Sequence, residues 1–153
     1  MKAILALAAV TALGGEAALA NEIFAAEPKT VVTTIQALGY RATLAREGTS
    51  TRVDSAIAGL NYVIDFYGCD DAGAACQFLE FTARFTVDPP AKPDTIALWN
   101  RDNLFGTAYL DDEGLANISY TVTTVGGLTA ANFTDVLARW EVTLDNFSKA
   151  IGY

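Results

Sequence analysis

The segment 62–85, YVIDFYGCDDAGAACQFLEFTARF, constrains the fold of this chain more than any other part of it. Both ends of the segment are rich in aromatic and β-branched residues and alternate in polarity with a period of two, which is typical of half-buried strands. A short acidic loop containing a glycine separates the two ends, and the only two cysteines, Cys69 and Cys76, flank it. The segment therefore predicts a β-hairpin.

The apolar residues of the two predicted strands share one face if Cys69 lies opposite Cys76. In that register the facing apolar pairs are Phe66 with Leu79, Ile64 with Phe81, and Tyr62 with Ala83. A slip by one residue would mix the apolar and polar faces, because successive side chains of a strand point to opposite sides. The pattern thus favours this register.

The same register places Asp65 opposite Glu80 on the other face, where two like charges are unfavourable. If Ala58-Gly59 is a two-residue turn, Arg52 of the preceding segment falls opposite Asp65. One cation would then serve both carboxylates. Paired acids can also act as general acid and base, but that chemistry calls for a cleft around perturbed carboxylates. We favour the structural interpretation of this pair.

The first twenty residues have the pattern of a Sec-type secretory signal. A positive start, Met1-Lys2, precedes an apolar run over 3–13, and Ala18-Leu19-Ala20 forms a cleavage site before Asn21. The apolar run is too short to span a membrane. We therefore expect a signal peptide over 1–20, a mature domain over 21–153, and export to the periplasm or secretion.

In an exported chain, Cys69 and Cys76 predict a disulfide bond across the turn. A redox pair would usually have the spacing Cys-x-x-Cys. A metal site would need more thiolates or imidazoles than a chain without histidine can provide. The disulfide is therefore the interpretation that we adopt.

Composition excludes several classes of function. The chain has no histidine, which rules out Ser-His-Asp and Cys-His catalysis. Its net charge of −8, without a basic cluster, argues against nucleic acid or an anionic membrane surface as a partner. Acidic loops at 70–73 and 111–114 lack the ligand spacing of a calcium site and are better explained as turns. We predict no catalytic residue, metal or cofactor.

The remaining segments predict an α+β domain with an antiparallel sheet. Its expected order is helix, four-stranded meander, helix, two strands, helix, with the sheet flanked by helices. The expected bounds are a helix from Glu27-Pro28 to Gly39, strands over 40–46 and 51–57 before the hairpin, a proline-rich connector over 88–93, a helix over 94–104, strands over 106–111 and 115–125, and a last helix that Thr129 caps.

The most promising polar cluster for binding is Trp99-Asn100-Arg101, together with Tyr109. An arginine beside a tryptophan could hold a carboxylate or stack on a ligand. Alternatively, Trp99 anchors its helix while Asn100 and Arg101 bond to neighbouring carbonyls and acidic turns. We favour this structural alternative and retain the four residues as candidate binding residues.

A series of motifs, in order along nearly the whole mature chain, resembles the YbjN family of bacterial sensory transduction regulators. The motifs are Gly39-Tyr40-Arg41-Ala42, Tyr62-x-Ile64-x-Phe66-Tyr67-Gly68-Cys69, Cys76-x-x-Leu79-x-Phe81-x-Ala83-x-Phe85, Trp99-Asn100-Arg101, Phe105-Gly106-x-Ala108-Tyr109-Leu110-Asp111, and Gly127-x-Thr129-x-x-Asn132-Phe133. The resemblance implies a compact α+β fold similar to type III secretion chaperones, which bind protein segments without turnover. It implies no catalytic residues.

We therefore predict a non-enzymatic, periplasmic regulatory protein with chaperone-like binding of another protein. Its sheet face or last helix would form the contact, and a homodimer is one arrangement that we consider. The alternative is a small-ligand-binding module with its pocket near Trp99, Arg101 and Tyr109.

Overall fold

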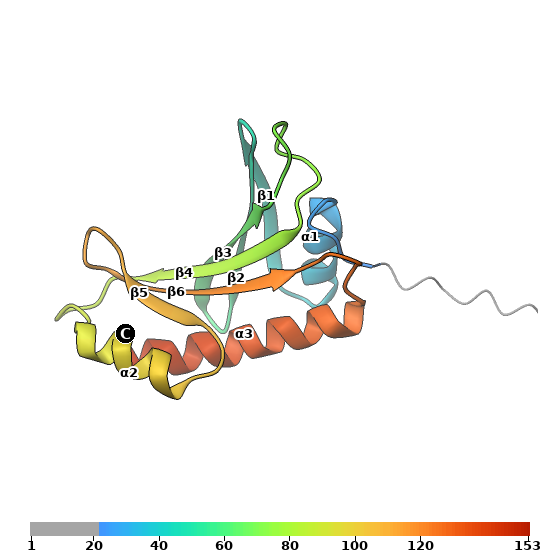
Figure 1. Cartoon of the computed structure of the whole chain (residues 1–153). Helices are drawn as coiled ribbons and strands as arrows, with labels where there is room; N and C mark the ends of the chain where they lie inside the picture. Colours follow the sequence, from blue (N-terminus) through green and yellow to red (C-terminus); the bar gives the residue numbers. More distant parts are fainter. Residues whose placement is uncertain (1–21) are drawn as a thin grey trace, which may run out of the picture.

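The computed structural model describes residues 22–153, and these form an α+β domain around one six-stranded antiparallel sheet (Figure 1). The predicted signal peptide lies outside the described residues. The elements are α1 (Pro28–Ala37), β1 (Arg41–Glu47), β2 (Ser50–Ile57), β3 (Leu60–Tyr67), β4 (Phe78–Phe85), α2 (Pro93–Asp102), β5 (Thr107–Leu110), β6 (Ala116–Thr123) and α3 (Ala130–Ile151). The predicted fold class is confirmed.

Strands β1 to β4 form the expected meander, and their register is the predicted one. Across β3 and β4, Phe66 pairs with Leu79, and the acids Asp65 and Glu80 lie opposite each other. Ala58-Gly59 is the turn between β2 and β3, with φ angles of 50° and 80°. Positive φ at both positions is the geometry of a type I′ turn, whose twist matches that of the strands.

The order of strands in the sheet is β1-β2-β3-β4-β6-β5. From β4 the chain passes through α2 to the far edge, forms the short β5, and returns as β6 in the gap. The interior position suits β6, because its apolar residues face those of β4: Ile118 lies opposite Ala83, Tyr120 opposite Phe81, and Val122 opposite Leu79.

The apolar face of the sheet is covered by α3, which lies along β4 and β6, with α2 beside β5 and α1 beside β1 (Figure 1). Phe81 is fully buried at the centre, with its ring centroid 5.7 Å from that of Trp140 on α3 and 6.1 Å from that of Tyr62. Thr129 caps α3 as predicted, its hydroxyl accepting the Asn132 N–H at 3.1 Å. The core therefore lies between the sheet and α3.

The predicted disulfide joins Cys69 and Cys76 at the end of the β3–β4 hairpin. Asp70 holds the enclosed loop, because its Oδ1 accepts the N–H groups of Ala72 and Ala74 at 3.0 and 2.8 Å. The loop packs against the β1–β2 turn, where Gly73 lies directly against the Thr49 backbone. The acidic loop therefore forms a turn of the kind that Asp favours.

Candidate functional site

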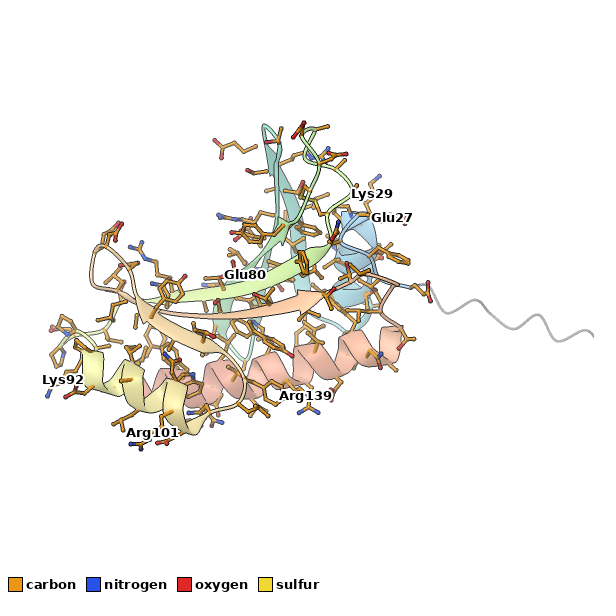
Figure 2. All side chains as sticks on the ribbon, in the orientation of Figure 1. Glu27, Lys29, Glu80, Lys92, Arg101 and Arg139 are labelled. Atoms are coloured by element: carbon orange, nitrogen blue, oxygen red, sulfur yellow. A yellow bond between two sulfur atoms is a disulfide. The ribbon has the colours of Figure 1, made fainter. Side chains whose placement is uncertain are left out.

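The sheet has a second face, on the side away from α3. We call this the outer face and define it by the alternate residues that point there: Arg52, Asp54, Val63, Asp65, Tyr67, Phe78, Glu80, Thr82, Ser119, Thr121, Thr123 and Tyr109. Three of its aromatic side chains are well exposed, with 50% for Tyr67, 41% for Tyr109 and 36% for Phe78. No helix of the described chain covers this face, and Glu80 stands near its middle (Figure 2).

Near the centre of the outer face, the acids Asp54, Asp65 and Glu80 surround one arginine, Arg52. The Nε of Arg52 lies 3.0 Å from Oδ1 of Asp65, so the predicted pair forms. Within residues 22–153, Arg52 makes no ion pair with Glu80. Glu80 lies opposite Thr121 of the neighbouring strand β6. The expectation that one cation serves both acids is therefore met only for Asp65.

The two exposed tyrosines lie close to these acids. Partial burial, followed by the charges of Glu80 and Asp65, raises the pKa of Tyr67. Partial burial and the charges of Glu80, Asp111 and Asp65 raise the pKa of Tyr109. Because the same carboxylates act on both phenols, the tyrosines and the acids belong to one electrostatic cluster that disfavours any further negative charge.

Three adjoining hollows open on the outer face. Their volumes are about 660, 530 and 430 Å³. The first two share Arg52 and Asp65, and the third contains Glu80 and shares Tyr67 with the first. They form a broad, shallow surface with aromatic and acidic walls. Such a shape suits contact with a protein segment better than enclosure of a small molecule.

The candidate residues on α2 do not gather around a cavity. Trp99 is buried, its Nε1–H donates to the Gly106 carbonyl at 3.0 Å, and its ring centroid lies 5.1 Å from that of Phe147 on α3. The Asn100 amide donates to the Ala108 carbonyl at 2.9 Å and accepts the Ala108 N–H at 2.8 Å. Both side chains thus fasten α2 to its neighbours.

Arg101 and Tyr109 point to different parts of the surface. Arg101 pairs with Asp102 at 2.6 Å, and its side chain is 68% exposed at the end of α2 (Figure 2). Tyr109 belongs to the outer face, whereas Asn100 bonds to the backbone of Ala108 at the edge of β5. A ligand pocket shared by Trp99, Arg101 and Tyr109 stays a prediction that this arrangement does not support.

Comparison with known proteins identifies the family. The family model described as "Putative bacterial sensory transduction regulator" matches residues 27–152, from the start of α1 to the end of α3. The chain belongs to the YbjN family. No curated protein and no solved structure matches it significantly, so the chaperone-like fold remains an implication of the resemblance. Among residues 22–153, no helix has the length and apolar character needed to cross a lipid bilayer.

A network centred on Asp111 closes one end of the outer face in this YbjN protein. The Nε of Arg84 donates to Oδ2 of Asp111 at 2.6 Å, and Asn117 Nδ2 donates to the same oxygen at 3.0 Å. Desolvation acts to raise the pKa of Asp111, but these bonds and the N–H groups of Leu115 and Glu113 outweigh it and lower the pKa to about 2. The sequence signal for this network is the Asp-x-x-Gly pattern over 111–114, which we interpreted only as a turn and not as a network centred on Asp111.

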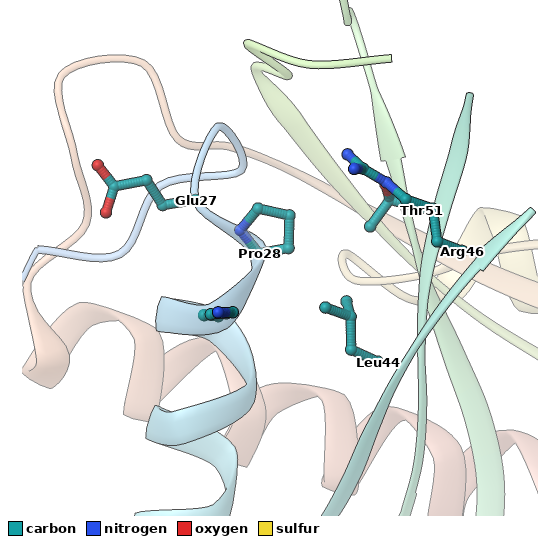
Figure 3. Close-up of a pocket in the computed structure, with 6 residues that line it drawn as sticks. Glu27, Pro28, Leu44, Arg46 and Thr51 are labelled. Atoms are coloured by element: carbon teal, nitrogen blue, oxygen red, sulfur yellow. The ribbon is translucent and has the colours of Figure 1, made fainter. Parts of the chain in front are cut away.

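A separate hollow of about 360 Å³ lies on the helix side of the YbjN fold, between the start of α1 and the strands β1 and β2. Pro28 and Leu44 face it from opposite sides (Figure 3). Arg46 lines it as well, and its Nε donates to the Thr51 hydroxyl at 3.2 Å. Leu44 is 40% exposed, which leaves an apolar side chain uncovered near the edge of the sheet.

Proposed function

We propose that this YbjN protein is a regulator that acts by binding another protein on its outer face, without catalytic turnover. The single observation that carries the proposal is the uncovered sheet face, on which Tyr67, Phe78 and Tyr109 are exposed around an acidic centre. Tyrosine and other aromatic side chains are enriched at the energetic centres of protein interfaces. Family membership supports the regulatory role.

The chemistry of the outer face favours a partner segment that carries Lys or Arg. Asp54, Asp65 and Glu80 contribute three negative charges near its centre, against one positive charge from Arg52. Two further arginines lie toward the margins of the face: Arg84 is already paired with Asp111 and Glu113, and Arg41 is on the edge strand β1. The whole chain has a net charge of −8. A cationic segment would gain from this field during approach and from contact with the exposed aromatic rings.

Binding without turnover is the simplest use of these acids. Asp65 is paired with Arg52, whose side chain is 53% exposed, on a face that no described helix covers, so water screens the pair. The sequence also lacks histidine, the commonest general base. We therefore assign Asp65 and Glu80 to recognition.

We place this activity in the periplasm or outside the cell. Support comes from the signal pattern over 1–20 and from the Cys69–Cys76 disulfide, which persists best in an oxidising compartment. The folded unit that binds would be the predicted mature domain, 21–153.

Site-specific photo-crosslinking in cells that export the full chain tests the proposal. We expect a photoreactive amino acid at Tyr67 to form a crosslinked adduct that grows weaker with Glu80→Lys and with added salt. The matched control position is Leu98, an apolar residue on α2 that is 49% exposed. Adducts of equal yield from both positions, or adducts insensitive to Glu80→Lys, would show that the outer face is not the binding surface.

A further inference from the structure

The two edge strands of the sheet, β5 and β1, differ in whether their outward backbone groups already have hydrogen-bond partners. At the β5 edge, the Asn100 side chain bonds to both the N–H and the carbonyl of Ala108, as a neighbouring strand would. An added strand cannot use these groups without displacing Asn100. Sheet edges that are left open invite pairing with another chain, and proteins commonly block them. The β5 edge is blocked in this way.

The β1 edge is open over its second half. Glu47 and Ser50 flank the two-residue turn Gly48-Thr49, so they form a hydrogen-bonded pair. Along β1 the alternate residues Arg41, Thr43, Ala45 and Glu47 therefore bond to β2, and the backbone groups of Ala42, Leu44 and Arg46 face outward. Gln36 Nε2 donates to the Ala42 carbonyl at 2.9 Å. No described residue outside the sheet ladder bonds to the backbone of Leu44 or Arg46.

We propose that β1 pairs with β1 of a second copy, antiparallel, around a two-fold axis at Leu44. All seven residues of β1 lie opposite a residue of the second β1 in this register. The Ala42 carbonyl already accepts the Gln36 amide and keeps a second lone pair for the N–H of the partner's Arg46. Arg41 then lies opposite Glu47 of the partner subunit, and Glu47 opposite the partner subunit's Arg41. Two symmetric ion pairs form across the interface, and this self-complementary charge pattern identifies a second copy as the occupant.

The hydrogen-bond pattern reinforces these ion pairs. Arg41 and Glu47 occupy non-hydrogen-bonded positions with respect to the new neighbour, where facing side chains approach most closely. On the helix side, the exposed Leu44 meets the partner's Leu44 across the axis, and this apolar surface leaves water. The product is a continuous sheet with the two outer faces side by side. The inference goes beyond the proposed function, because the dimer would form even if the outer face bound nothing.

Sedimentation equilibrium of the purified mature protein in physiological salt tests the pairing. We expect a concentration-dependent dimer, about tenfold weaker in Glu47→Arg and Arg41→Glu, since each change turns two attractive pairs into repulsive ones. The double variant R41E/E47R exchanges the charges and should restore wild-type affinity to within about threefold. The matched control is Asp112→Arg, the same change of charge in an exposed turn, which should leave dimerisation unchanged.

Leu44→Pro provides a second test that does not depend on charge. Because the N–H of Leu44 faces outward, proline removes a bond of the new interface and none of the β1–β2 ladder. We expect this variant to be a folded monomer by circular dichroism. A wild-type protein that is monomeric at all concentrations would overturn the proposal. A dimer that survives Leu44→Pro, or that R41E/E47R fails to rescue, would overturn the β1 register.

Discussion

Removal of the disulfide by the double substitution C69S/C76S should lower the free energy of unfolding by about 2.5 kcal/mol. The two cysteines are separated by 7 positions, and a crosslink that closes so short a loop restricts the unfolded chain by about that amount in the chain-entropy model. The folded hairpin keeps its other restraints, including the bonds to Asp70 and the Gln77 N–H to Tyr67 carbonyl bond of 2.9 Å. The loss is therefore expected to act through the unfolded state.

Urea unfolding followed by tryptophan fluorescence measures this loss, since both Trp99 and Trp140 are buried. For a domain of this size the midpoint should fall by about 1.5 M. The melting temperature should fall by about 10 °C. A reducing agent should produce the same decrease in the wild-type protein and no change in the double variant.

Equal midpoints for the oxidised wild type and the double variant would refute the reasoning. That result would mean that the turn at Asp70 restricts the unfolded chain as tightly as the covalent bond does. A much larger loss, accompanied by changes in near-ultraviolet circular dichroism, would refute it differently. The bond would then hold the native hairpin in place rather than restrict the unfolded chain.

Three further predictions concern single side chains. Acidification from pH 5 to pH 2 should destabilise the wild type more than the variant Asp111→Asn. Hydrogen bonds lower the pKa of Asp111 to about 2, so its contribution to the free energy of unfolding is present above the ordinary pKa of Asp and is lost as the pH falls through 2. Urea midpoints that fall in parallel for the two proteins would contradict this. Between pH 10 and 12 the free energy of unfolding of the wild type should fall by up to about 3 kcal/mol relative to that of Tyr62→Phe. Burial raises the pKa of Tyr62 to about 12 in the folded protein, so as the pH rises the Tyr62 phenol loses its proton in the unfolded chain before it does so in the folded one. Gly73→Ala should cost more than about 2 kcal/mol, since a methyl group there would collide with the Thr49 carbonyl, whereas Gly48→Ala, with φ of +59° and open space, should cost about 1 kcal/mol by thermal unfolding.

The sequence was sufficient to predict the β3–β4 hairpin, because its information is local. Side chains alternate along a strand, so the match of Phe66 to Leu79 and of Asp65 to Glu80 follows once the apolar residues must share a face. The turn at Ala58-Gly59 then fixed the position of Arg52 opposite Asp65. Such pairings depend on short loops, which leave few alternative registers.

The order of the last two strands could not be predicted in the same way. Segments 106–111 and 115–125 are both predicted strands, and the hairpin between them is compatible with either strand next to β4. Packing decides the order: β6 is eight residues long and its alternate residues Ile118, Tyr120 and Val122 face the core with those of β4, whereas β5 is only four residues long. The strand order therefore depends on tertiary contacts, which cannot be read from either segment alone.

The role of Asn100 was equally inaccessible from the sequence. A carboxamide beside a tryptophan and an arginine looks the same whether it binds a ligand or backbone, because its donor and acceptor suit both. Only the position of α2 beside β5 shows that Ala108 takes both groups. The same fact distinguishes the two sheet edges.

The outer face owes its composition to the strand order. Because β6 lies between β4 and β5, Glu80 is paired with Thr121, and Tyr109 comes close enough for Glu80 and Asp65 to raise the pKa of its phenol. With β5 and β6 exchanged, β5 would adjoin β4, and Tyr109 would have a different set of neighbours. The cluster is therefore a product of topology. Tyr109→Phe and Glu80→Gln should both affect partner binding, and both should change the stability of the isolated domain very little.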